Sequence, residues 1–508
     1  MSRRDRAESE AEPHTTIAGQ TVRGSLYSVG AASITITFGL IRSIILARLL
    51  LPEHFGVMAL ALFFVNMAGQ LRTLGIDRAL LHRQTTDSAV YGTYLTMKLA
   101  LAGGTTLVVI LLAPWIARLY PQQPLLAPVM IALAGITFLS AVSQTQETLL
   151  GMKLNFRALA LTNVAASAVM TVVAPYLAWR GWGVWSLVAE LGSGILTRFL
   201  LVWGPLRVGA FRPRFERAEA RWFWHYGRAT WIGANVGFLL NRFDDFWVGT
   251  ALGKTPLGFY AKAYEFARYP RRLLANPLVS VLAPVFARLQ DDRLRLSKAY
   301  FRLMSLLVRM GFLAGGLGVL LAPEFVFYAL GAKWMPMVRA FQLMIVYVLL
   351  DPLLMTTSNL LLAVGAPEGL ARARVGQLLF FIPAVILGGR WAGIEGVALA
   401  ADGMLIVGFA LLYRSARRYV DYSVLRLFAW PAVGAVFGLA AVGVSLGVEG
   451  IGRPQPWNLA ALKAGAFALP FCVWLFLFER RELAQMARLV WASLASLRGG
   501  QHTVLEEG

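Results

Sequence analysis

The sequence is poor in the residues that build disulfide frameworks and metal sites. Its 508 residues include one cysteine and five histidines. The cysteine, Cys472, lies in an apolar run, which excludes a disulfide framework and a thiolate metal site. The histidines are scattered without the spacing of metal ligands. The sequence therefore predicts neither a metal centre nor a cofactor.

Charged residues are also scarce. Only 15% of the residues are charged and 57% are hydrophobic, whereas a soluble globular chain has about 25% charged and about 45–50% apolar residues. This composition predicts an all-α polytopic membrane protein. A formal net charge of +21 would suggest nucleic acid as the partner of a soluble protein. Here the basic residues fall between apolar segments, so they indicate membrane topology and no nucleic-acid partner.

Apolar stretches long enough to cross a bilayer recur along the chain. We count about fourteen, at 23–49, 55–76, 90–113, 125–147, 157–179, 182–204, 225–252, 257–287, 302–322, 337–363, 370–389, 391–413, 427–447 and 459–478. An even number of spans places both termini on the same side of the membrane.

The lysines and arginines alternate loop by loop. If the N-terminus is cytoplasmic, the inside segments hold about thirty of them and the outside loops about eight. The bias predicts cytoplasmic N- and C-termini. It also requires the charge-rich stretch 257–287 to cross, because without that crossing the basic cluster from Arg288 to Arg302 would lie outside.

A basic connector separates the first six spans from the next six, which suggests a repeat. The corner Ala47–Ala59 aligns with Gly249–Ala261, so that Gly56 falls on Gly258. We expect two six-helix lobes and two extra C-terminal helices. The expected parts are a disordered cytoplasmic tail (1–22), an N-lobe (23–204), a basic cytoplasmic linker (205–224), a C-lobe (225–413), two further spans (427–478) and an amphipathic cytoplasmic tail (479–508).

The stretch from Tyr226 to Leu289 carries charges at membrane depth, where they are costly and mark function. From the helical rise, Arg242 and Asp245 lie roughly 13 to 18 Å below the outer connector, and Arg268 roughly 16 Å below it. Arg268, Arg271 and Arg272 follow i, i+3, i+4 spacing, which predicts that they share one helix face. Such a cationic wall is suited to a polyanion such as a diphosphate.

Two other interpretations of these charges are open. Arg242 with Asp245, and Glu265 with Arg268, have the spacing of helical ion pairs and would then form only a structural network. Alternatively, Lys254–Asn276 lies outside the membrane, although the alternation of basic loops favours a crossing.

Several short motifs, in order along the chain, resemble one transporter family. They include Ala47-Arg48-Leu49-Leu50-x-Pro52-x-x-Phe55-Gly56, Asp245-Phe246-Trp247-Val248-Gly249, Leu257-Gly258-Phe259-Tyr260, Pro284–Asp292 and Leu330-Gly331-Ala332-Lys333-Trp334. The set resembles the polysaccharide transport family of the multidrug/oligosaccharidyl-lipid/polysaccharide exporter superfamily, which contains the flippases for O-antigen, capsule and exopolysaccharide.

The resemblance implies a bacterial inner-membrane flippase for undecaprenyl-diphosphate-linked oligosaccharide, two lobes rocking around a cationic cavity, and no enzyme activity. Partners would be membrane lipids and the polymerase and glycosyltransferases of the same pathway. The diphosphate-binding candidates are Arg42, Arg242, Lys262, Arg268, Arg271 and Arg272. Asp244, Asp245 and Glu147 are candidates for coupling to a proton or sodium gradient.

Two other functions compete with this one. A drug or cation antiporter of the same superfamily would favour an acidic or apolar cavity, whereas the central charge here is basic. A membrane polysaccharide polymerase or lipid glycosyltransferase would need a large outer loop or an acidic metal cluster, and the sequence contains neither.

Overall fold

The computed structural model describes residues 17–70, 75–83, 87–209, 213–276, 279, 285–452 and 454–480. Within these ranges the chain forms helices joined by short connections, and it contains no strand. Most of the expected N-terminal tail (1–16) and of the amphipathic C-terminal tail (481–508) lies outside the described residues.

The first half of the described chain contains seven helices. They are α2 (Ile17–Leu49), α3 (Pro52–Gln70), α4 (Ile76–Arg83), α5 (Ser88–Arg118), α6 (Leu126–Met152), α7 (Phe156–Trp179) and α8 (Val184–Trp203). Side-chain caps fix two of the starts, since Asp87 accepts a hydrogen bond from the Ala89 amide and Asn155 accepts one from the Ala158 amide.

The second half begins with the long helix α9. Its elements are α9 (Arg217–Ala251), α10 (Lys254–Ala267), the π-helical turn η1 (Arg271–Ala275), α12 (Arg293–Glu324), the π-helical turn η2 (Phe325–Leu330), the 3-10 turn η3 (Ala332–Met337), α13 (Val338–Met344), α14 (Val346–Ala363), α15 (Pro367–Ala416), α16 (Val424–Gly452) and α17 (Trp457–Phe478).

The described part of the chain contains ten helices that are long and apolar enough to cross a membrane by length and composition. This confirms a polytopic helical membrane protein. α15 is one of the ten, and its backbone leaves helical geometry at Ala392 and Gly393, so it covers the two expected spans 370–389 and 391–413. The ten do not include α3, α9 and α10, and the number fourteen stays a prediction.

One expected span differs in shape. The stretch 257–287 was expected to be one helix, but α10 ends at Ala267 and the π-helical turn η1 follows. Pro270 supplies the reason, since proline has no amide hydrogen to continue the helical bonding. The change of helical pitch turns the side chains after Pro270 away from the directions that a continuous α-helix would give them.

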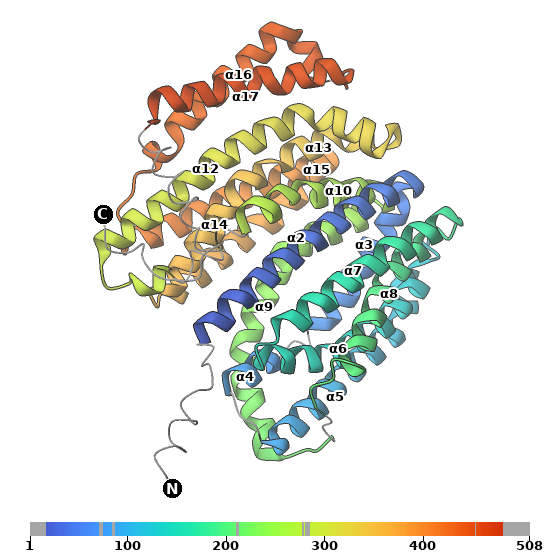
Figure 1. Ribbon diagram of the computed structural model, residues 1–508. Coiled ribbons are helices and arrows are strands. Elements are labelled where there is room, and N and C mark those ends of the chain that lie inside the picture. The colour runs from blue at the N-terminus through green and yellow to red at the C-terminus, as the bar shows by residue number, and fades with distance from the viewer. Residues whose placement is uncertain are drawn as a thin grey trace, which may run out of the picture.

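Two sharp corners define one end of the molecule, which we call the corner end. There α2 turns into α3 at Leu50–Leu51, and α9 turns into α10 at Leu252–Gly253. Gly253 has φ +98°, a conformation that favours glycine. α3 packs along α10, and α2 packs against α7 on one side and contacts η1 and η2 on the other. In Figure 1, α2 lies between the helices of the first half and those of the second.

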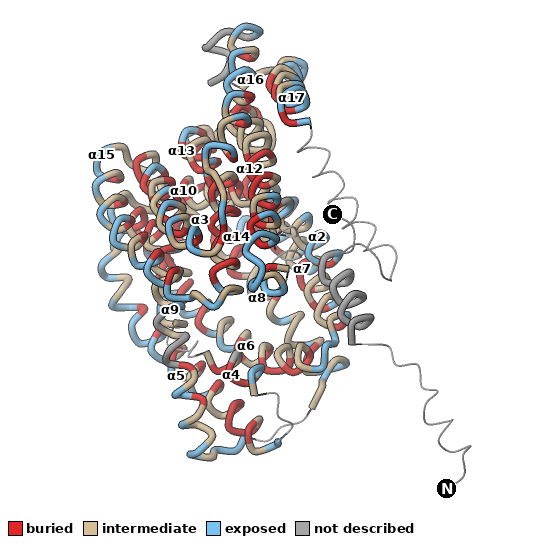
Figure 2. Tube along the Cα trace, turned by 90° about the vertical axis from the view of Figure 1, so that its left-hand side faces the viewer, coloured by how far each residue is buried: buried red, intermediate tan, exposed pale blue. Residues whose placement is uncertain are grey.

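Burial follows the pattern of a protein in lipid. Figure 2 shows buried residues on the inner sides of the helices and exposed residues on the outer sides. Large apolar side chains are among the most exposed, for example Leu111 and Trp115 on α5 and Leu469 and Leu477 on α17. A soluble protein rarely shows so much exposed apolar surface, so we assign these faces to the bilayer.

The helices α16 and α17 form a separate antiparallel pair that packs on α12 (Figure 1). Two buried ion pairs fasten it. Lys463 Nζ lies 3.0 Å from Glu324 Oε1, and Arg309 Nε donates to Glu479 Oε2 at 2.7 Å. All four side chains are at most 6% exposed. The charges at Lys463 and Arg309 are therefore satisfied inside the protein.

Candidate functional site

A central cavity of about 470 Å³ lies between α2, α3, α8, α9 and α10. It collects five of the six predicted diphosphate-binding residues, because its lining includes Arg42, Arg242, Lys262, Arg268 and Arg272. Towards the corner end, Leu46 and Phe55 stand at its boundary, one helical turn from the corner. The cavity therefore has cationic walls and an apolar end.

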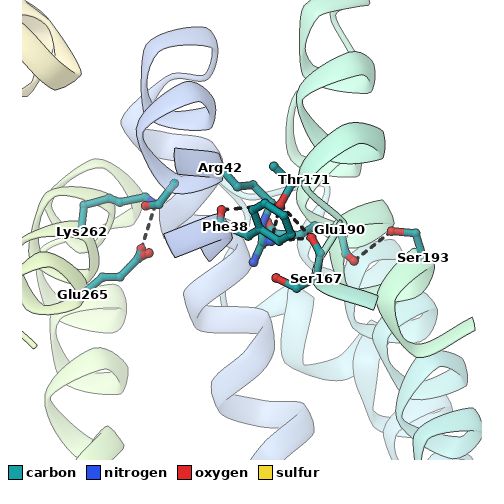
Figure 3. A network of polar contacts seen from close by, with 9 residues as sticks. Phe38, Arg42, Ser167, Thr171, Glu190, Ser193, Lys262 and Glu265 are labelled. Carbon is teal, nitrogen blue, oxygen red and sulfur yellow. Dashed lines mark hydrogen bonds and ion pairs between the residues drawn. The ribbon is translucent and has the colours of Figure 1, made fainter. Parts of the chain in front are cut away.

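Arg42 on α2 is held by acceptors from α7 and α8. Its Nε donates to Glu190 Oε1 at 2.6 Å, and its Nη1 lies 3.2 Å from Thr171 Oγ1 and 3.5 Å from the Ser167 carbonyl oxygen. Figure 3 shows this group on one side of α2. The Arg42 charge is thus compensated by Glu190, and its main effect is to tie α2 to α7 and α8.

Lys262 on α10 faces α2 from the opposite side (Figure 3). Its Nζ lies 2.8 Å from Ser43 Oγ and 2.8 Å from Glu265 Oε2, and 4.3 Å from the centre of the Phe55 ring. The side chain is only 6% exposed. The ammonium group therefore joins α10 to α2 close to the corner end of the cavity.

On α9, the predicted pairing of Arg242 with Asp245 is confirmed, with Nη1 2.9 Å from Oδ2. Arg242 keeps 41% of its side chain exposed, whereas Asp245 is 5% exposed. The neighbouring Asp244 does not line the cavity and accepts a hydrogen bond from the Tyr260 hydroxyl at 2.6 Å. Its other oxygen, Oδ1, is buried without a hydrogen-bond partner among the described residues.

Arg268 and Arg272 differ from the other cations of the cavity. Within the described residues neither forms an ion pair; each guanidinium lies over a tyrosine ring, Arg268 over Tyr264 at 5.0 Å and Arg272 over Tyr269 at 5.5 Å. The expected pairing of Glu265 with Arg268 is wrong, because Glu265 pairs with Lys262. Arg268 Nε is buried and has no hydrogen-bond partner in the described chain. These two arginines are the cations left for a ligand.

The prediction that Arg268, Arg271 and Arg272 share one face is wrong. The π-helical turn η1 starts at Arg271 and changes the helical phase. Arg271 instead forms an ion pair with Asp351 of α14 and lines a second cavity between α9, α14 and α15. Sequence spacing assumed an unbroken α-helix, and Pro270 was the available signal against it.

Glu147 lies apart from the central cavity. It lines a cavity of about 250 Å³ formed by residues of α6, α7 and α8, together with Arg198 and Gln144. The three acidic candidates for ion coupling therefore fall in two places, Asp244 and Asp245 on α9 and Glu147 on α6.

Two carboxylates of the cavity are missing from the set predicted by sequence. Glu190 and Glu265 line it and hold Arg42 and Lys262. The sequence contained a signal for the pairing of Glu190 with Arg42. A lone carboxylate inside an apolar span needs a cation from another span, and Arg42 lies at a similar depth below the corner end. With Asp245, three acidic groups face five cations, so the lining has an excess of two positive charges.

The corner end is closed by a clasp between distant parts of the chain, formed by Arg48, Lys333 and Trp334. Lys333 Nζ donates to the carbonyl oxygens of Arg48 and Leu50 at 2.7 and 2.8 Å. Trp334 Nε1 donates to the Ala47 carbonyl at 2.8 Å, and Arg48 donates to the carbonyls of Tyr328 and Ala329. Nearby, Lys254 pairs with Glu53 at 2.8 Å. These contacts join the C-terminal end of α2 to η2 and η3.

Comparison with known proteins relates this chain to proteins of polysaccharide biosynthesis. The family model described as "Polysaccharide biosynthesis protein" matches residues 45–339. The lipopolysaccharide biosynthesis protein WzxC of Escherichia coli (strain K12) is 26% identical over 404 residues, which cover 78% of this chain and 80% of that protein.

Two solved structures share the fold. The lipid II flippase MurJ in an inward closed conformation has a TM-score of 0.72 at 15% identity, covering 90% of this chain and 99% of that chain. An inward-facing multidrug resistance MATE family transporter of the MOP superfamily has a TM-score of 0.55 at 17% identity, covering 78% and 95%. The family model spans more than half of the sequence; this chain is a member of the polysaccharide biosynthesis protein family, with the fold of the multidrug/oligosaccharidyl-lipid/polysaccharide exporter superfamily.

Proposed function

We propose that this protein is a flippase that moves a polyprenyl-diphosphate-linked oligosaccharide, with undecaprenyl as the lipid, across the bacterial inner membrane for capsule, exopolysaccharide or O-antigen export. The observation that carries the proposal is that two cavity arginines, Arg268 and Arg272, form no ion pair with any residue that the structure describes. A diphosphate diester carries one negative charge on each phosphate, which matches the excess of two positive charges in the lining.

The chemistry of the two arginines favours phosphate over other ligands. A guanidinium presents planar paired donors that match phosphate oxygens, and it remains charged inside the membrane. The stacking of each on a tyrosine fixes its plane before a ligand arrives, which lowers the ordering cost of binding. Arg42, Arg242 and Lys262 complete the positive field, although their carboxylate partners offset much of their charge.

The relatives point in the same direction. The E. coli relative is named for lipopolysaccharide biosynthesis, and the structure with the higher TM-score is a lipid flippase. We propose fourteen spans with both termini in the cytoplasm, arranged as an N-lobe (23–204) and a C-lobe (225–413) joined by the linker 205–224, with the pair 427–478 beside them. The protein works beside the polymerase and glycosyltransferases of its pathway and is not itself an enzyme.

Transport follows alternating access in this proposal. The cavity is closed at the corner end by the clasp, and the headgroup enters from the opposite, cytoplasmic end. Separation of the lobes at the corner end then releases it to the outer leaflet. Asp244 and Asp245 on α9, or Glu147 on α6, couple this change to a proton or sodium gradient.

A drug or cation antiporter is the alternative from the same superfamily, and the likeness to the MATE structure favours it. An excess of positive charge in the central cavity opposes it, because a cationic drug would be repelled. A polysaccharide polymerase remains the alternative from the enzyme class.

The test is translocation in proteoliposomes. A fluorescent farnesyl-diphosphate-linked oligosaccharide is placed in both leaflets, and an external glycosidase cleaves only the outer pool. A flippase exposes the inner pool, so protection is lost. We expect the Arg268→Ala/Arg272→Ala variant to slow this loss by at least about tenfold, since two charge-assisted hydrogen-bonding sites are removed. Arg302→Ala, an exposed arginine of α12 outside the cavity, is the matched control.

The outcomes separate the site from the function. If the double variant transports like the wild type, the diphosphate site lies elsewhere. If the wild type moves no probe carrying the pathway's own glycan, but exports a cationic dye, the antiporter is correct.

A further inference from the structure

A second cavity lies behind the wall of the central one. It has a volume of about 290 Å³ and is formed by α9, η1, α14 and α15. Its polar lining contains Asn241, Ser358, Asn359, Arg374 and Gln377, together with the ion pair of Arg271 and Asp351. The proposed diphosphate site uses none of these groups, because Arg271, which the sequence assigned to it, pairs with Asp351 and does not line the central cavity.

The two cavities are neighbours. Asn241 of α9 lines the second cavity and the adjacent Arg242 lines the central cavity, so α9 itself separates the two. The segment from Arg268 to Arg271 also separates the two cavities, because Arg268 lines the central cavity and Arg271 lines the second one. The remaining wall is a pair of tyrosines, since the Tyr264 hydroxyl of the central cavity donates to the Tyr347 hydroxyl of the second at 3.1 Å. A sugar linked to a diphosphate in the central cavity would therefore enter the second cavity by parting the side chains of Tyr264 and Tyr347.

The charge of the second cavity suits a neutral ligand. Arg271 and Asp351 compensate each other, and Arg374 is an exposed residue at the rim. An anion site would need an excess of buried cations and a cation site an excess of carboxylates. The remaining groups are amides and a hydroxyl, which offer donors and acceptors together.

Part of this hydrogen-bonding capacity is unused. Gln377 donates to the Met404 carbonyl at 3.2 Å, and Asn241 donates to the Gly237 carbonyl at 2.6 Å, which leaves the amide oxygen of each as an acceptor. Asn359 and Arg374 form no hydrogen bond or ion pair within the described chain. The half-buried Asn359 amide offers both donors and acceptors.

We infer that this cavity is a glycan subsite that binds a sugar residue of the lipid-linked oligosaccharide while the diphosphate is held by Arg268 and Arg272. The inference rests on the proposed function. A hexose ring carries hydroxyls that both donate and accept, which planar amides recognise, and a cavity of about 300 Å³ is at the lower end of the size of small-ligand sites. The second cavity therefore contributes to sugar selectivity and the central cavity to anchoring.

The experiment compares binding of farnesyl diphosphate with binding of farnesyl-diphosphate-linked glucose, galactose and N-acetylglucosamine to the detergent-solubilised protein. The test variants are Asn359→Leu and Asn241→Leu, which keep the number and branching of the side-chain heavy atoms but remove the amide. The control is Asn458→Leu, the same change at an exposed position of α17. Arg268→Ala reports on the diphosphate site.

We expect at least one sugar to tighten wild-type binding relative to farnesyl diphosphate. Each test variant should lose this gain by about fivefold, while binding of farnesyl diphosphate is unchanged and so shows that the variant is folded. Arg268→Ala should weaken binding of every probe.

Other results identify which idea fails. If no sugar tightens binding, or both test variants keep the full gain, the second cavity is not a glycan subsite and the diphosphate site stands. If Arg268→Ala binds every probe like the wild type, the proposed diphosphate site fails, whatever the asparagine variants do.

Discussion

Gly56 and Gly258 lie against each other's helices in a reciprocal manner. A Cβ atom on Gly56 would lie 1.8 Å from the carbonyl oxygen of Lys254, and one on Gly258 would lie 1.9 Å from that of Pro52. In the repeat aligned by sequence, Gly56 corresponds to Gly258 and Pro52 to Lys254. The contact therefore has the symmetry expected where two copies of one corner cross, with α3 on α10.

A first prediction concerns this crossing. Gly258→Ala should separate α3 from α10, because Cβ atoms do not approach other atoms to within 3.0 Å. We expect a longer and broader distance between nitroxide labels at Leu51 and Arg339, both exposed near the corner end, measured by electron spin resonance. The background is Cys472→Ser, since Cys472 is exposed.

Gly135→Ala is the control, because a Cβ on Gly135 of α6 would have no atom within 4 Å. If the label distances in Gly258→Ala matched those of the wild type, the added methyl group would be accommodated without separating α3 from α10, and the prediction would be wrong.

A second prediction concerns the clasp. Lys333 satisfies carbonyls at the C-terminal end of α2, where no further helical amide is available and the helix dipole favours a cation. Lys333→Met should weaken closure by about 1 kcal/mol, which is about a fivefold change in the ratio of open to closed molecules. The same label pair measures it. Lys298→Met, an exposed lysine of α12, should leave the ratio unchanged, and an equal effect of both changes would contradict a specific role of Lys333.

A third prediction separates charge from geometry at the diphosphate site. Arg268→Lys keeps the positive charge but removes the planar donors and their stacking on Tyr264. We expect its affinity for farnesyl diphosphate to fall between those of the wild type and Arg268→Ala, about tenfold below the wild type. Titration in detergent gives the dissociation constants. Equal affinity of the lysine variant and the wild type would mean that charge alone matters.

A fourth prediction concerns the attachment of the C-terminal helix pair. Glu479→Gln leaves the buried Arg309 without its anion and should cost about 3–5 kcal/mol in the free energy of unfolding. Arg309→Met/Glu479→Met removes both charges and should restore most of that loss. Thermal unfolding in detergent measures both.

The exposed pair of Arg293 and Asp421 provides the comparison. Asp421→Asn should change stability by less than about 1 kcal/mol, because both side chains are more than half exposed. A double methionine variant as unstable as Glu479→Gln would show that the ion pair itself, and not the avoidance of a lone charge, stabilises the docking.

The sequence predicted the helical membrane fold well because spans are recognised from length and apolarity alone. The helices α2, α5, α6, α7 and α8 begin and end within a few residues of the expected spans, apart from the longer N-terminal end of α2. The same reasoning failed where local geometry changes. Pro270 followed by a π-helical turn leaves no mark on average hydropathy. The break at Ala392–Gly393 inside α15, in contrast, falls within a few residues of the expected boundary between the spans 370–389 and 391–413.

The candidate site was predicted in part. Depth from the helical rise placed Arg242 and Arg268 at the same level, and the structure puts both in one cavity with the other candidates Arg42, Lys262 and Arg272. The partner of Arg271 was beyond the sequence, because Asp351 comes from a helix far along the chain, whereas the lone carboxylate of Glu190 was an available signal for Arg42. Spacing finds pairs within a helix, such as Arg242 with Asp245, but which helices face each other is decided by the packing of the whole bundle.

The helix α9 has 35 residues, so it extends about 52 Å, well beyond the apolar core of a bilayer. Its first turns are packed against α4 and α5. There Glu219 forms an ion pair with Arg83, and Phe223 packs in an apolar cluster with Tyr94. Its last turn reaches the opposite end, at the α10 corner. A helix of this length acts as a stiff rod between α4 and α5 at one end and the α10 corner at the other, so a small tilt of its first turns becomes a larger displacement of the corner.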